Sequence, residues 1–197
     1  PPRSTLFPYT TLFRSCGVVL MIAGALVPGA APVLSNYVPV IADPIYFVGL
    51  VLVFAGLLLC FMDGRFLRPT APAPTPSPDL HSTAAALWVP PEAAAGFKTA
   101  AVAFLVAMLT LVAGWSGTPR FLDDRNYYEL VFWGGGHVLQ VANVSAMLGV
   151  WLWLLAAKLG RPVIRPGTAW VLFALLLAPH LFGPLLAREG TLSSTYR

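Results

Sequence analysis

Residues 130–157 read LVFWGGGHVLQVANVSAMLGVWLWLLAA and contain no Asp, Glu, Lys or Arg. About 20 predominantly apolar residues are enough for a helix to cross a bilayer, and this run is longer. A single histidine, His137, follows three consecutive glycines near its start. Because lipid does not tolerate the unpaired backbone groups of an open sheet edge, a run of this length and character predicts a membrane-spanning helix.

Four further apolar runs have the same character, and the composition of the whole chain agrees with them. Of the 197 residues, 57% are hydrophobic and 10% are charged, whereas soluble domains carry about 25% charged residues. This composition excludes an ordinary soluble domain, and its hydrophobicity excludes disorder. We therefore expect an all-α polytopic transmembrane helix bundle in a lipid bilayer. Its five predicted spans are 16–34, 45–62, 97–115, 130–157 and 168–186.

Two segments outside the spans have distinctive compositions. Residues 1–15 contain Thr-Leu-Phe twice and resemble translated sequencing adapter, so we expect them to be non-native. The remaining residues, 16–197, are then one transmembrane domain, which we expect to be a fragment of a longer subunit. Within it, residues 69–91 are rich in proline and predict an extended cytoplasmic linker.

Basic residues predict how the spans are oriented. Lys158, Arg161 and Arg165 lie between the fourth and fifth spans, Arg65 and Arg68 follow the second, and the loop after the first has no Lys or Arg. The positive-inside rule places the loops after the second and fourth spans in the cytoplasm. The net charge is +4, but the basic residues form no block, so we expect no nucleic-acid partner.

Two histidines lie inside predicted spans, where a polar group is a functional hypothesis by default. His137 is seven residues from Leu130, and His180 is seven residues from Ala187. At about 1.5 Å per residue, both side chains are expected roughly 10 Å below the outer surface, on neighbouring antiparallel helices. They are candidate ligands of one copper, iron or zinc ion. The alternative is that each histidine is a separate, hydrogen-bonded interior residue.

The residues around His137 favour a site. Small residues such as Gly134, Gly135 and Gly136 permit close approach of another helix or of a flat cofactor. Trp133 and Gln140 stand four residues before and three residues after His137, so they share its helix face. Trp133 has an equally good interpretation as an aromatic anchor at the membrane interface.

These residues resemble a known family. Trp133 to Gln140, WGGGHVLQ, followed by WLW at 151–153, resembles the sixth helix of haem-copper oxidase subunit I, in particular a divergent branch of cytochrome c oxidase subunit I. The segment 36–40, NYVPV, with Asp43 and Pro44 resembles the loop after the third helix of that branch. The resemblance implies that the five spans are helices three to seven of about twelve.

The resemblance also implies a site and cofactors. His137 and His180 would bind the copper (or non-haem iron) of the oxygen-reducing centre, and the haem ligands would come from helices outside this chain. Trp133 and Gln140 would orient the ligands, and Gly134, Gly135 and Gly136 would lie against the cofactor. Two positions depart from the family: Pro179 replaces the first histidine of a pair, and Val141 replaces a tyrosine.

The function implied is respiratory electron transfer to oxygen by a catalytic subunit of a bacterial inner membrane. Its partners would be other oxidase subunits and a cytochrome c or quinol electron donor. Because of Pro179 and Val141, two alternatives stay open. One is a nitric oxide reductase-like member of the same superfamily. The other is a non-enzymatic polytopic protein, a transporter or sensor, whose metal site has decayed.

Overall fold

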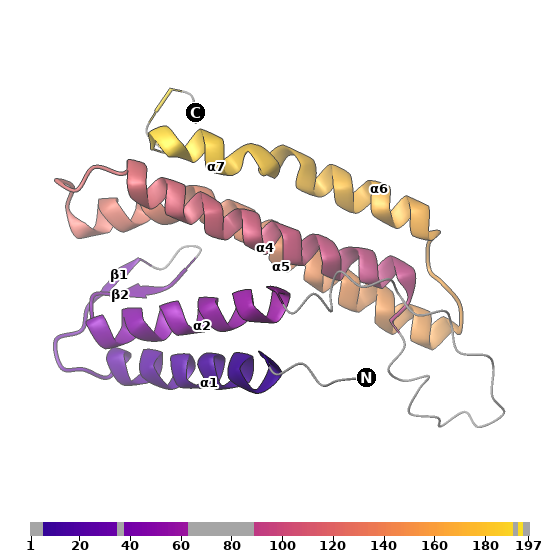
Figure 1. Ribbon diagram of the computed structural model, residues 1–197, viewed down its shortest axis with the longest axis horizontal. Helices are drawn as coiled ribbons and strands as arrows, with labels where there is room; N and C mark the ends of the chain where they lie inside the picture. Colours follow the sequence, from indigo (N-terminus) through magenta and orange to yellow (C-terminus); the bar gives the residue numbers. More distant parts are fainter. Residues whose placement is uncertain (1–5, 35–37, 63–88, 191–192, 195–197) are drawn as a thin grey trace.

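The computed structural model describes residues 6–34, 38–62, 89–190 and 193–194. It is an elongated bundle whose long helices lie side by side (Figure 1). The helical hairpin α1–α2 forms one side, the pair α4–α5 forms the centre, and α6 with α7 forms the other side. The expected all-α fold is confirmed. The long helices are α1 (Leu6–Ala25), α2 (Pro44–Met62), α4 (Pro91–Gly117), α5 (Asp124–Leu159) and α6 (Pro166–Leu177).

Four segments are long and apolar enough to cross a membrane, and they correspond to the second to fifth predicted spans. They are Pro44–Phe61, Pro91–Gly117, Asp124–Leu159 and Pro166–Glu189. Helix α1 adds a shorter apolar segment, Tyr9–Ala25. The observed helices α4 and α5 extend beyond the predicted 97–115 and 130–157, because their end turns contain polar residues that hydropathy alone does not count as membrane-spanning.

The predicted bounds of the first span, 16–34, were wrong. Helix α1 ends at Ala25, because the chain turns at Val27–Gly29, where Pro28 is followed by Gly29 with a φ of 88°. Residues Pro32–Leu34 form a short strand, β1, that pairs antiparallel with β2 (Val40–Ile41). The bundle therefore contains one small two-stranded ribbon. The predicted linker 69–91 lies outside the described residues up to residue 88.

Local sequence signals set the ends of the central helices. Helix α4 begins at Pro91, where the missing backbone N–H would have no helical partner. The carboxylate of Asp123 caps α5 by accepting a hydrogen bond from the backbone N–H of Asn126. Helix α5 ends before Gly160, which adopts the left-handed conformation with a φ of 64°.

The fifth span is not one continuous α-helix. After α6 the chain tightens into a 3₁₀ turn, η2 (Ala178–Phe182), and then forms the short helix α7 (Gly183–Leu186) and a final turn, η3 (Ala187–Glu189). Pro179 and Pro184 explain this change, because each proline lacks the N–H that an α-helix uses to bond four residues back. His180 therefore lies on a tightened turn of the helix.

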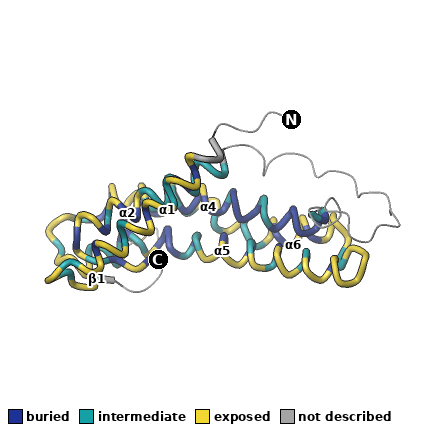
Figure 2. The backbone as a smooth tube through the Cα atoms, turned by 90° about the horizontal axis from the view of Figure 1, so that it is seen from below, coloured by how far each residue is buried: buried dark blue, intermediate teal, exposed yellow. Residues whose placement is uncertain are grey.

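Helix α4 is the centre of the bundle. Buried residues concentrate along it, whereas α6 is mostly exposed (Figure 2). At Gly96, α4 meets both α5 and α6 closely. A Cβ atom placed there would lie 2.9 Å from the Cα of Gly149, from the ring of Phe173 and from the carbonyl oxygen of Ser145. Small residues let α5 and α6 approach α4 this closely, as is usual for helix packing in membranes.

Glycines also let α1 and α2 approach each other closely within their hairpin. A Cβ atom at Gly49 would lie 2.6 Å from the carbonyl oxygen of Gly17. Aromatic rings then join α2 to the centre: Phe61 lies with its ring centroid 5.0 Å from that of Phe104, and Phe47 lies 5.4 Å from Tyr128.

We predict that Gly96→Ala destabilises the bundle. The added methyl group would meet backbone atoms of α5, which cannot move aside, and overpacking of this kind costs about 1–3 kcal/mol. Thermal unfolding in detergent, followed by tryptophan fluorescence, measures the loss. Gly167→Ala is the matched control, because nothing lies within 4 Å of a Cβ atom there. Equal melting temperatures for the two variants would contradict the packing described above.

We also predict a lowered pKa for Asp123. Hydrogen bonds from Asn126, first from its side chain and then from its backbone N–H, hold the pKa of the Asp123 carboxyl below 3.8. A group whose pKa is lowered by folding stabilises the fold above its unfolded pKa and loses that effect as the pH falls through its folded pKa. An NMR titration should find that the pKa of Asp123 is lowered from its usual value of 3.8, and Asn126→Ala should raise this pKa. An unchanged value in the variant would show that Asn126 is not the cause.

Candidate metal centre

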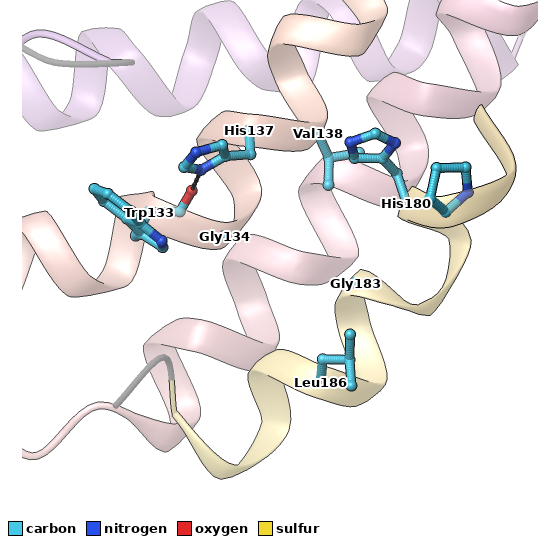
Figure 3. A pocket seen from close by; sticks show the side chains of 8 residues that line it. Trp133, Gly134, His137, Val138, His180, Gly183 and Leu186 are labelled. Carbon is cyan, nitrogen blue, oxygen red and sulfur yellow. Dashed lines mark hydrogen bonds between the residues drawn. The ribbon is translucent and has the colours of Figure 1, made fainter. Parts of the chain in front are cut away.

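The structure brings His137 and His180 to one pocket. The pocket has a volume of about 310 Å³ and lies between α5 and the broken end of the fifth span (Figure 3). Both histidines are partly buried. Their role as metal ligands stays a prediction. The pocket is lined by Trp133, Gly134, His137, Val138, Pro179, His180, Gly183 and Leu186.

Each histidine is anchored to its own helix through the same ring atom. The Nδ1 atom of His137 lies 2.7 Å from the carbonyl oxygen of Trp133, and Nδ1 of His180 lies 3.2 Å from the carbonyl oxygen of Leu176. In both cases the acceptor is the carbonyl four residues earlier. That carbonyl of Leu176 is available because Pro179 and the 3₁₀ turn interrupt the regular hydrogen bonds of α6 at this point.

These contacts determine the tautomer of each neutral ring. A carbonyl oxygen only accepts, so Nδ1 must carry the proton and donate. Nε2 then carries the lone pair, which is the electron pair that binds a metal. A histidine that ligates a metal commonly donates its other ring N–H to a carbonyl or carboxylate in this way. Both histidines therefore have the hydrogen-bonding arrangement of metal ligands.

The two rings do not converge on a common point in this conformation. In the close view, the side chain of Val138 lies between them, and the ring of His137 turns towards Trp133 (Figure 3). The two rings of Trp133 and His137 meet edge to face, with centroids 4.9 Å apart. In this conformation the two rings therefore do not hold one ion between them.

The other predicted site residues have different positions. Trp133 lines the pocket and is 40% exposed, while Gln140 is exposed and is not among the lining residues. Gly134 lines the pocket. Gly135 faces α4, since a Cβ atom there would lie 3.1 Å from the carbonyl oxygen of Ala107 and closer still to Leu111. Gly136 is buried. Of the three glycines, Gly135 clearly serves helix packing.

One polar residue near the pocket escaped the sequence analysis. Thr110 is buried on α4, and its hydroxyl donates to the carbonyl of Val106 at 2.7 Å. A Cβ atom at Gly183 would lie 2.9 Å from the Thr110 hydroxyl oxygen, so this hydroxyl borders the pocket wall. No sequence signal separates Thr110 from other small residues of α4, because only the packing of α7 brings it there.

Within the described ranges, no group of three or more His, Cys, Asp or Glu residues is placed to hold a metal ion. The pocket offers two imidazoles, so a complete site needs a further donor such as water. No family model, curated protein or solved structure matches the chain. The assignment therefore depends on the geometry of the pocket and on the resemblance of WGGGHVLQ to the oxidase helix.

We predict that His137 and His180 are both Nδ1-protonated when neutral and without metal. ¹⁵N chemical shifts of imidazole nitrogens distinguish the two tautomers, and His137→Gln and His180→Gln variants assign the signals. The physical reason is the carbonyl contact of each Nδ1. Detection of a neutral ring protonated at Nε2 in either residue would contradict the geometry.

Proposed function

We propose that the chain is a segment of a haem-copper oxidase-like catalytic subunit, in which His137 and His180 hold the non-haem metal. The observation that carries the proposal is that both imidazoles line one pocket and both use Nδ1 for a main-chain carbonyl. The positions of His137 and His180 in the sequence predicted equal depths in the membrane, and in the folded chain both residues line the same pocket.

The donor set suits copper. Imidazole nitrogen is a good ligand for copper and for iron, and both rings would present Nε2. The bound haem and copper would supply the redox chemistry that reduces oxygen to water. The haem ligands would belong to helices outside this chain, and water would complete the donors of the metal.

The chain's own residues would bind and shield the metal. The carbonyls of Trp133 and Leu176 orient the two rings through Nδ1. Val138 and Leu186 make the pocket wall apolar, which limits water and strengthens the metal–ligand interaction. Gly183 lets α7 pack closely against the Thr110 hydroxyl of α4.

The setting of this activity follows from the apolar helices. Their length and composition indicate a lipid bilayer environment. We propose further that the membrane is a bacterial inner membrane, that the basic loop after α5 is cytoplasmic, and that the partners are other oxidase subunits and a cytochrome c or quinol donor.

Three specific features favour competing functions. Val141 is buried where the oxidase family has a tyrosine, which favours a nitric oxide reductase-like reaction at the same metal. Val138 stands between the two rings, and Pro179 replaces a histidine, which favours a transporter or sensor with a decayed site. Metal binding separates the last function from the other two.

We predict that the purified full chain binds one copper ion and that His137→Ala and His180→Ala each lose it. Removal of a group that only orients a ligand weakens metal binding by roughly 10–100-fold, so loss of a ligand should exceed that range. Copper content after dialysis, measured by atomic emission, and the electron paramagnetic resonance spectrum of Cu²⁺ report the result.

His81→Ala is the matched control, because His81 lies outside the predicted spans. It should bind copper as the unmodified chain does. If all three variants retain copper equally, the ion sits elsewhere and the site assignment is wrong. If the unmodified chain binds neither copper nor iron, the function without a metal is favoured.

A further inference from the structure

Glu92 is the most deeply buried acidic or basic residue among those described. It lies in the first turn of α4, and its side chain is 0% exposed. Burial of a carboxyl group is costly unless its oxygens are paired, so a buried carboxyl inside a membrane bundle is a functional hypothesis by default. The histidine pocket lies near the opposite end of α4 and does not include Glu92.

Only one of the two carboxyl oxygens is paired. Oε1 accepts a hydrogen bond of 3.1 Å from the backbone N–H of Val163, which belongs to the loop between α5 and α6. Oε2 is buried and has no hydrogen-bond partner in the described part of the chain. The loop therefore closes over the carboxyl group and leaves one oxygen facing the interior.

No cation neutralises Glu92 in the described residues. The basic residues nearest to it along the surrounding elements are Lys158 at the end of α5, Arg161 and Arg165 in the loop, and Lys98 on α4. The structure places none of them in an ion pair with Glu92. A proton on Oε2 would remove the charge from this buried group, since a protonated carboxyl is neutral.

Two buried hydroxyls lie on the same face of α4 as Glu92. Thr99 and Thr110 follow it by seven and by a further eleven residues, which are close to two and three helical turns, so all three lie on one face. Both threonines are buried, and Thr110 borders the histidine pocket. Ser145 of α5 lies beside Gly96, one turn after Glu92, and its buried hydroxyl also has no partner in the described residues.

We propose that Glu92 is a proton-exchange group, which takes up a proton from the side of the bundle where the α5–α6 loop covers it and releases it towards the buried hydroxyls of α4 and α5. Uptake forms one O–H bond on Oε2 while a hydronium ion loses one and becomes water, and release is the reverse. The exchange itself is a property of this carboxyl. Delivery to the histidine pocket rests on the proposed function, since oxygen reduction consumes protons.

The test is infrared spectroscopy of the full chain in detergent, without added metal. A protonated carboxyl in apolar surroundings has a carbonyl stretching band separate from those of amides, and the band moves to lower frequency when O–H becomes O–D. We expect this band in the unmodified chain, a shift of the whole band in D₂O, and its complete loss in Glu92→Gln.

Glu92→Gln separates proton exchange from a structural role, because the amide oxygen still accepts the Val163 N–H but the side chain holds no exchangeable carboxyl proton. Glu92→Asp keeps a carboxyl group and should restore a band at a shifted position, and it serves as the second variant if the glutamine variant fails to fold. Glu189→Gln, at an exposed glutamate, is the matched control and should leave the band intact.

Three results would overturn the proposal. The first is a band that persists in Glu92→Gln, and the second is a band that does not shift in D₂O. The third is the absence of any band in the unmodified chain, when this chain and Glu92→Gln are equally stable. The last result would make Glu92 only an acceptor for the loop. Because the measurement needs no metal, failure of copper binding at His137 does not affect it, and the two proposals fail separately.

Discussion

The close approach of α5 and α6 to α4 at Gly96 is the contact on which the rest of the bundle depends. In lipid the hydrophobic effect does not draw apolar helices together, so they associate through packing and hydrogen bonds. The backbone of Gly149 and the ring of Phe173 occupy the space that a side chain at position 96 would need. This contact sets how α5 and the fifth span lie on α4, and therefore where the pocket that both histidines line is formed.

Helix interruptions then shape the site itself. Pro179 prevents α6 from continuing, and the resulting 3₁₀ turn leaves the Leu176 carbonyl for Nδ1 of His180. In α5, which is unbroken, His137 makes the equivalent contact to Trp133 through its rotamer. Two different backbone conformations thus produce the same ring chemistry, with the lone pair on Nε2 in both neutral rings. Pro179, one of the two positions at which the chain departs from the oxidase family it resembles, is also the residue that shapes the turn.

Buried polar groups are the energetic cost of this arrangement. Glu92 and Ser145 each keep an oxygen without a hydrogen-bond partner among the described residues, and such oxygens cost free energy in a bundle interior. Thr110 avoids the cost by donating to the carbonyl of Val106. The oxygens that bear the cost lie on the α4 contact, away from the lipid-facing surface. The closely packed residues and the buried polar groups therefore lie along the same helix, α4.

The sequence by itself determined the fold class, because long apolar runs have only one stable form in lipid. Helix ends at Pro91, Asp123 and Gly160 are also set by local chemistry, although the predicted spans of 97–115 and 130–157 did not include them. Only the tertiary structure decided the extent of α1, the common pocket of the two histidines and the burial of Glu92. The first depends on a turn at Pro28 and Gly29 inside an apolar run. The others depend on the fifth span and on the loop at Val163, which only folding brings close to their partners.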